Sequence, residues 1–173
     1  MQGLLLSGYV FLLLVGASGP VMGEPGVGAD RLKGVISLRF PGTEWVARED
    51  LANWMGELDP PVVILDARRE EEFAVSHLLH AVQVDPDVEA ENLGDPPRDA
   101  RIVVYCSVGY RSAAVAKRLS EAGYETVYNL EGGIFGWANH GLAVYRGENP
   151  VASVHPYNRT WGKLLDEKFH PEK

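Results

Sequence analysis

The chain has 173 residues, with 16 basic and 24 acidic side chains and a formal net charge of −8. Its hydrophobic fraction of 46% and charged fraction of 23% are ordinary for a globular domain, which argues against a disordered or fibrous protein. The length predicts one domain with extensions. The net acidity disfavours non-specific binding to nucleic acid or to an anionic membrane surface, so we expect no nucleic-acid partner.

The single cysteine, Cys106, limits the chemistry open to this chain. It excludes an intramolecular disulfide and a metal cluster held by several thiolates of the same chain. A lone cysteine is more often a small buried hydrophobic residue than a nucleophile. The residues around Cys106 must therefore decide between these two interpretations.

Residues 1–23 have features of an export segment. Residues 4–15 form an uncharged apolar run, and the small residues before Glu24 suit a cleavage site. No Lys or Arg precedes the run, and counted to Met22 it approaches the length of a membrane span. We expect an extracytoplasmic location, periplasmic or secreted. Residues 1–23 are then either a cleaved signal peptide or an uncleaved anchor, and only the anchor would bring the protein to a membrane.

The chain beyond Glu24 alternates between strand and helix patterns. Residues 24–33 are rich in Gly, Pro and charge and predict a linker. The two clearest strands are unbroken apolar runs rich in β-branched residues, at 62–65 and 102–105, which are typical of strands buried on both faces. The other expected elements are short strands at 34–38, 81–84 and 126–128, helices at 46–57, 69–75, 112–122 and 132–137, and a loop at 85–100.

Strands that alternate with helices predict an α/β fold, with a mostly parallel five-stranded sheet and helices on both faces. The expected domain spans residues 34–146. Residues 147–173 form a polar tail with scattered aromatic residues, which either packs on the domain or serves a protein partner.

The stretch from Cys106 to Ser112 lies between a predicted buried strand and a predicted helix. Ligands of open parallel sheets bind at the carboxyl ends of the strands. A tight loop there directs successive N–H groups into a common space, and the helix N-terminus adds partial positive charge. Both effects favour a thiolate, and the same amides would hold an anionic persulfide. Gly109 gives the loop backbone freedom, and Arg111 either adds a cation or braces the loop.

Four segments of the chain resemble, in the same order, the motifs of rhodanese-type sulfurtransferases. The resemblance covers roughly residues 34–146 and implies the rhodanese-like fold, with neither a metal nor an organic cofactor. The four segments are Asp-Ala-Arg at 66–68, Phe-x3-His-Leu at 73–78, the loop at 106–112, and Gly-Gly-x3-Trp at 132–137.

The resemblance also implies a reaction in two steps. The Cys106 thiolate would take a sulfane sulfur from a small persulfide or thiosulfate-type donor, and the resulting persulfide would pass it to a thiol or cyanide acceptor. Asp66 and Arg68 would be a structural pair that braces the loop. The substrate would be bound by the loop residues Ser107, Val108, Gly109, Tyr110 and Arg111.

Spacing and charge in this loop favour some substrates over others. Four residues separate Cys106 from Arg111, whereas the related phosphatases have five, so we do not expect phosphatase activity. Ser107 and Val108 stand where many thiosulfate-using relatives carry Arg or Lys, which leaves Arg111 as the only cation of the loop. Thiosulfate is a dianion, so we expect poor thiosulfate turnover and favour a persulfide or polysulfide donor.

Two other functions remain open from the sequence. In the first, Cys106 belongs to a sulfur-carrier or relay protein, loaded and unloaded only by a specific partner that docks on residues 147–173. In the second, the chain is a redox or binding module on the same fold without transfer activity, since a fold alone does not settle function. The loop contains Cys106, Gly109 and Arg111 together, which argues against a site that has lost its catalytic residues.

Overall fold

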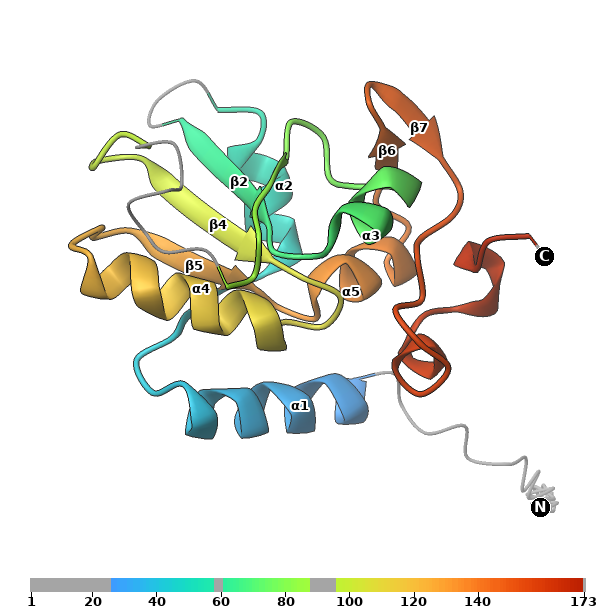
Figure 1. Cartoon of the computed structure of the whole chain (residues 1–173), viewed down its shortest axis with the longest axis horizontal. Coiled ribbons are helices and arrows are strands. Elements are labelled where there is room, and N and C mark those ends of the chain that lie inside the picture. Colours follow the sequence, from blue (N-terminus) through green and yellow to red (C-terminus); the bar gives the residue numbers. More distant parts are fainter. Residues whose placement is uncertain (1–25, 58–60, 88–95, 173) are drawn as a thin grey trace, which may run out of the picture.

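The computed structural model describes residues 26–57, 61–87 and 96–172, in which helices surround one parallel sheet (Figure 1). The sheet has five strands in the order β1-β5-β4-β2-β3. Every pairing in it is parallel, which confirms the predicted sheet. The five strands are β1 (Glu44–Val46), β2 (Val62–Asp66), β3 (Val82–Gln83), β4 (Arg101–Tyr105) and β5 (Val127–Leu130).

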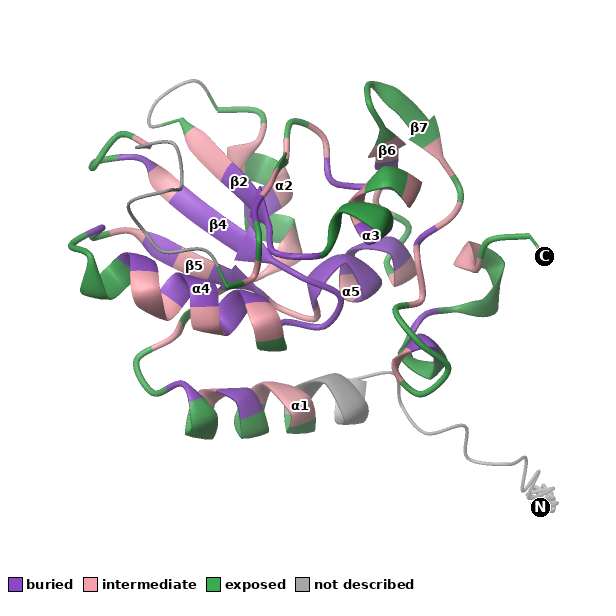
Figure 2. Cartoon of the chain, viewed as in Figure 1, coloured by how far each residue is buried: buried purple, intermediate pink, exposed green. Residues whose placement is uncertain are grey.

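The two central strands explain why the sheet forms where it does. β2 and β4 pair over their whole lengths, from Val62 opposite Arg101 to Asp66 opposite Tyr105. Residues 102–105 are completely buried, as the colouring of β4 in Figure 2 shows. A strand buried on both faces needs apolar side chains at successive positions, which is the pattern that the sequence carries here.

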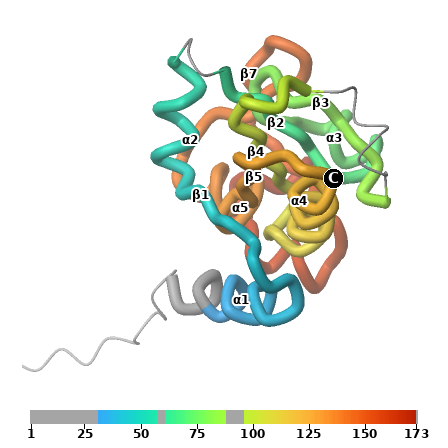
Figure 3. Tube along the Cα trace, turned by 90° about the vertical axis from the view of Figure 1, so that its left-hand side faces the viewer, coloured from blue at the N-terminus to red at the C-terminus, as the bar shows by residue number. Residues whose placement is uncertain are grey.

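Helices cover both faces of the sheet (Figure 3). Successive side chains of a strand point to opposite faces. Val103 therefore packs in the cluster that contains residues of α2 and α5, and Val104 packs in the cluster that contains residues of α4. The five helices are α1 (Gly26–Arg39), α2 (Arg48–Trp54), α3 (Glu70–Val75), α4 (Tyr110–Glu121) and α5 (Gly133–Asn139).

The N-terminal part of the domain differs from the prediction. The strand expected at 34–38 is wrong, because these residues and residues 26–33 of the predicted linker lie in α1. Ile36 and Phe40, four residues apart, are buried against Ala113 of α4, whereas Leu38 between them is exposed. This spacing is helical, and five apolar-rich residues alone do not separate the two structures.

The fifth strand is β1, which was not predicted; only its last residue, Val46, falls in the helix predicted at 46–57. Val46 pairs with Leu130 in the sheet, and the helix begins only at Arg48. The other predicted strands and helices are confirmed, with ends that differ by at most three residues.

The C-terminal tail packs on the domain. β6 (Val144–Arg146) and β7 (Asn149–Val151) form an antiparallel hairpin, and two short 3-10 helices follow, η2 (Trp161–Leu164) and η3 (Glu167–Phe169). Val154 and Leu165 of the tail are buried in the same core cluster as α5. Of the two alternatives for this segment, the described residues thus show packing on the domain.

The predicted export segment, residues 1–23, lies outside the described residues. Residues 88–95 of the predicted loop at 85–100 also lie outside them. Within the described ranges, no helix is both long enough and apolar enough to cross a membrane.

Candidate active site

Cys106 lies directly after β4, where the chain turns into α4. Its side chain is buried, and the Sγ atom accepts a hydrogen bond from the Gly109 N–H at 3.2 Å. Gly109 has a φ of +103°, in the left-handed region that favours glycine. A Cβ atom at this position would also come within 3.3 Å of the Trp45 ring. The loop can therefore turn an N–H group back onto the sulfur only because residue 109 is glycine.

The carbonyl groups of the loop are held by neighbouring elements. The Cys106 and Ser107 carbonyls accept the N–H groups of Ile134 and Phe135, at 2.9 and 3.1 Å, from the start of α5. The Gly109 carbonyl accepts the side-chain amide of Asn129 at 2.8 Å.

These contacts also orient the N–H groups of the loop. In a trans peptide the C=O and the following N–H point in opposite directions. The N–H groups of Ser107, Val108 and Tyr110 thus point away from α5 and Asn129, and they have no acceptor among the described residues. Amides so arranged can bind an anion.

The start of α5 can approach the loop this closely because it contains Gly133. A Cβ atom at residue 133 would lie 2.3 Å from the Cys106 carbonyl oxygen and 2.7 Å from that of Ser107. No real Cβ contact is that short, so only glycine fits. The Gly-Gly-x3-Trp motif and the cysteine loop are therefore parts of one site.

Arg111 is held in an ion pair rather than free in the site. Its two terminal nitrogens donate to the carboxylate of Glu72 at 2.6 and 2.8 Å. The Ser107 hydroxyl donates to the same carboxylate at 3.1 Å and accepts from Arg111 at 3.0 Å. Burial alone would raise the pKa of Glu72 and lower that of Arg111. The pairing outweighs burial in both cases, so the pKa of Glu72 lies below 4.5 and that of Arg111 lies above its ordinary value.

Asp66 and Arg68 form a second ion pair, which is completely buried. Arg68 also donates to the Ser76 carbonyl at 2.6 Å, and the Tyr105 hydroxyl donates to Asp66 at 2.5 Å. Burial and the Asp66 charge raise the pKa of Tyr105, which keeps its hydroxyl protonated. The hydrogen bonds of this pair thus reach Tyr105, directly before Cys106, and Ser76 after α3. Among the described residues, the hydrogen bonds that other segments make to loop 107–111 come from Glu72, Asn129 and α5.

A cavity of about 110 Å³ opens at the sulfur. Its walls come from two parts of the chain that are far apart in the sequence. The Tyr157 ring lies 4.7 Å from the Arg111 guanidinium, so the tail covers the ion pair on one side. The lining residues are Cys106, Ser107, Val108, Tyr110 and Arg111 from the loop and Tyr157 and Trp161 from the tail.

The sequence analysis missed four residues of this site. Glu72 is the last of three consecutive glutamates in the helix predicted at 69–75, and it is buried. Asn129 follows the predicted strand at 126–128 and precedes the Gly-Gly pair, and that position was the available signal. Tyr157 and Trp161 lie in the tail, where no motif marked them.

Comparisons with known proteins identify the family to which this chain belongs. The chain matches the rhodanese-like domain over residues 47–140. It is 35% identical over 83 residues to a sulfurtransferase of Allochromatium vinosum, which covers 48% of this chain and 78% of the relative. It is also 33% identical over 102 residues to a tRNA uridine(34) hydroxylase of Pectobacterium carotovorum. That match covers 56% of this chain but 28% of the hydroxylase.

A solved structure agrees with these matches. The crystal structure of a rhodanese-related protein from Thermoplasma volcanium has a TM-score of 0.53 and 25% identity, and it covers 60% of this chain and 98% of that chain. The matched residues 47–140 include the cysteine loop, Glu72, Asn129 and Gly133, whereas Tyr157 and Trp161 lie beyond them. The chain therefore belongs to the rhodanese-like domain family.

Proposed function

We propose that the protein is a sulfurtransferase that carries sulfur as a persulfide on Cys106. The observation that supports this most directly is the position of the Cys106 sulfur, in a small cavity and in contact with the Gly109 N–H. The unpartnered N–H groups of the same loop would stabilise negative charge on an added outer sulfur.

The proposed reaction has two nucleophilic steps. The Cys106 thiolate attacks the sulfane sulfur of a donor persulfide, the S–S bond of the donor breaks, and the donor leaves as a thiolate that takes a proton from water. An acceptor thiolate or cyanide then attacks the outer sulfur of the Cys106 persulfide and regenerates the Cys106 thiolate. No net oxidation occurs, because the sulfane sulfur moves between groups of the same oxidation level.

The charge balance in the cavity favours a persulfide donor over thiosulfate. Arg111 is the only cation of the loop, and Glu72 neutralises it. A dianion such as thiosulfate would therefore meet no net positive charge from this pair, whereas a singly charged persulfide needs less compensation. The aromatic rings of Tyr110, Tyr157 and Trp161 further suit an organic donor.

Intact mass spectrometry tests the proposal directly. The purified protein is mixed with glutathione persulfide or with thiosulfate, and we expect a mass gain of one sulfur atom with the persulfide and much less gain with thiosulfate. Cyanide should remove the added sulfur. Cys106→Ser should fold normally, because the change is small, and should gain no sulfur at all.

The outcomes separate this function from its competitors. Loading of the Cys106→Ser variant would exclude Cys106 as the sulfur carrier. No loading of the unsubstituted protein by either donor would instead favour a partner-dependent relay or a binding module.

We also propose that the protein acts outside the cytoplasm. The apolar run at residues 4–15 and the small residues before Glu24 support this location. Expression in a secreting host tests it: the mass of the mature chain should lack residues 1–23 if the segment is cleaved. A full-length chain in the soluble cytoplasmic fraction would contradict the location.

A further inference from the structure

A second and larger cavity adjoins the sulfur cavity at Tyr157. The cavity at Cys106 measures about 110 Å³, which is room for a few water-sized groups. A persulfide sulfur and its neighbouring atoms fit there, but the rest of an organic donor does not. The second cavity measures about 600 Å³, within the range of small-molecule sites, and Tyr157 lines both.

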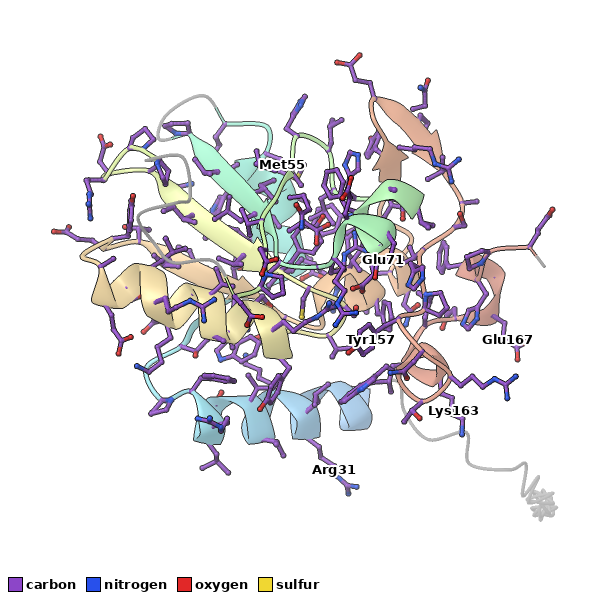
Figure 4. The ribbon with its side chains drawn as sticks, in the orientation of Figure 1. Arg31, Met55, Glu71, Tyr157, Lys163 and Glu167 are labelled. Atoms are coloured by element: carbon purple, nitrogen blue, oxygen red, sulfur yellow. The ribbon has the colours of Figure 1, made fainter. Side chains whose placement is uncertain are left out.

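The tail alone builds this second cavity. Tyr157 lies between the tail and the body of the domain, whereas Lys163 and Glu167 lie farther out on the tail (Figure 4). A molecule with its sulfur at Cys106 would thus extend past Tyr157 along the tail. The residues that line the second cavity are His155, Pro156, Tyr157, Asn158, Arg159, Gly162, Lys163, Leu165, Glu167 and His170.

The lining of the second cavity carries an excess of positive charge, although the whole chain is acidic. Arg159 and Lys163 are exposed and form no ion pair with a described residue, and they face a single acidic side chain, Glu167. This balance contrasts with the net charge of −8 for the chain. Two unpaired cations in a concave site attract a carboxylate.

His155 adds a hydrogen-bond donor to the same site. Its Nδ1 atom accepts the Tyr157 N–H at 3.1 Å, so in the neutral ring the proton lies on Nε2. Tyr157 itself has a φ of +61°, which is uncommon for a residue with a side chain. The His155 contact therefore helps to hold the residue that separates the two cavities.

We propose that the tail cavity binds the carboxylate-bearing body of a small organic thiol while its sulfur reaches Cys106. Arg159 and Lys163 bind the carboxylates, and Tyr157 lies at the junction between the organic body and the reacting sulfur. The assignment rests on the proposed sulfurtransferase function and names the class of its substrate: a low-molecular-mass thiol with at least one carboxylate, used as its persulfide.

Two donors that differ in charge test this assignment in the full chain. Glutathione persulfide carries two carboxylates, whereas hydroxyethyl persulfide carries none. We expect the double variant Arg159→Ala/Lys163→Ala to lose about tenfold in its second-order rate of loading by glutathione persulfide, because two charge contacts are removed. Its rate with hydroxyethyl persulfide should stay within twofold. Added salt should reduce the first rate in the unsubstituted protein and leave the second unchanged.

Lys168→Ala is the matched control. Lys168 is a cation of the same tail, but it lies over Phe169, is close to Asp166 and lines neither cavity. This variant should keep both rates. An equal loss with both donors in the double variant, or no loss with glutathione persulfide, would overturn the assignment.

Binding of S-methylglutathione separates this assignment from the reaction itself. This thioether has the carboxylates but cannot transfer sulfur, and its affinity can be measured by calorimetry. We expect the double variant, and not Lys168→Ala, to lose about tenfold in affinity. Failure of all donors to load Cys106 would contradict the proposed function while leaving this binding measurement valid. Failure of S-methylglutathione to bind would contradict the cavity assignment alone.

Discussion

The two walls of the sulfur cavity are built in different ways. The wall formed by residues 106–111 is fixed through its backbone: α5 binds two of its carbonyls, Asn129 binds a third, and Glu72 binds Ser107 and Arg111. The opposite wall consists of the side chains of Tyr157 and Trp161. The tail that carries them packs on the core through Val154 and Leu165, and Trp161 and Phe169 are partly buried against the same cluster.

Under the proposed function, we expect the loop wall to determine the sulfur chemistry and the tail wall to influence which donor binds. A substitution in the loop wall should move the groups that surround Cys106, because the hydrogen bonds of this wall share the same loop residues. A change of a tail side chain alters the space and charge beside the sulfur but leaves the loop contacts in place. The matched residues 47–140 contain the first wall, whereas the second wall lies outside the part of the chain that matches the family.

Gly133→Ala should have the largest effect on stability, because Gly133 makes the closest contact between α5 and the loop wall. A methyl group would lie 2.3 Å from the Cys106 carbonyl oxygen. Overpacking of backbone against a new side chain and the cost of a positive φ add up to about 3 kcal/mol or more of lost unfolding free energy. Sulfur loading of Cys106 should fall with it. Urea denaturation and intact mass spectrometry measure the two effects.

Gly141→Ala provides the control for this variant. Gly141 also has a positive φ, +76°, but a Cβ atom there would meet nothing within 4 Å. It should lose only about 1 kcal/mol and keep its loading rate. Equal losses in the two variants would show that the α5–loop contact is not what holds the loop.

Glu72→Gln should have the next largest effect, since it leaves the Arg111 charge without its partner. The carboxylate makes charged hydrogen bonds with Arg111 while buried, so we expect a loss of about 2 kcal/mol at pH 7. The pKa of Glu72 is below 4.5 in the folded protein, and therefore its stabilisation is present above pH 4.5 and is lost as the pH falls through the folded pKa. The difference between the two proteins should shrink in acid. Urea denaturation at several pH values measures this trend.

Glu71→Gln, which changes the neighbouring glutamate, is the control that tests whether the loss of stability is specific to Glu72. Glu71 is mostly exposed, and its one ion pair with a described residue is to Arg69, at 4.0 Å. Its substitution should change the unfolding free energy by less than about 0.5 kcal/mol. A difference between wild type and Glu72→Gln that stays constant down to pH 3 would contradict the ionised state inferred for Glu72.

The sequence predicted four of the five strands of the sheet and the position of Cys106 after β4, but not the contacts that hold the cysteine loop. Unbroken apolar runs predict β2 and β4 because both faces of these strands are covered, and the turn after β4 identifies Cys106. Glu72 was missed because its neighbours Glu70 and Glu71 are exposed, and only the arrival of Arg111 from α4 makes burial of the third carboxylate favourable. Such pairings join residues 39 positions apart, which no local pattern contains.

The tail was beyond prediction for a related reason. Residues 155–163 have no regular periodicity, and their position depends on packing of Val154 and Leu165 against α5. The same lack of pattern affected α1, where a short apolar stretch predicted a strand. In both segments tertiary contacts, rather than local preference, select the structure.

Trp161→Ala should affect stability less than Gly133→Ala and Glu72→Gln do, and should have the clearest effect on donor choice. Trp161 is partly buried, packs against the α5 core cluster and lines the sulfur cavity. Its loss should cost about 1 kcal/mol of stability, and the widened cavity should raise loading by benzyl persulfide relative to hydroxyethyl persulfide by about threefold or more. Phe169→Ala removes another partly buried aromatic ring of the tail from the same cluster, but this ring lines neither cavity. It should lose similar stability and keep the ratio of the two loading rates. If both variants shift the ratio alike, the tail acts through its packing as a whole, and the division between a chemical wall and a selective wall fails.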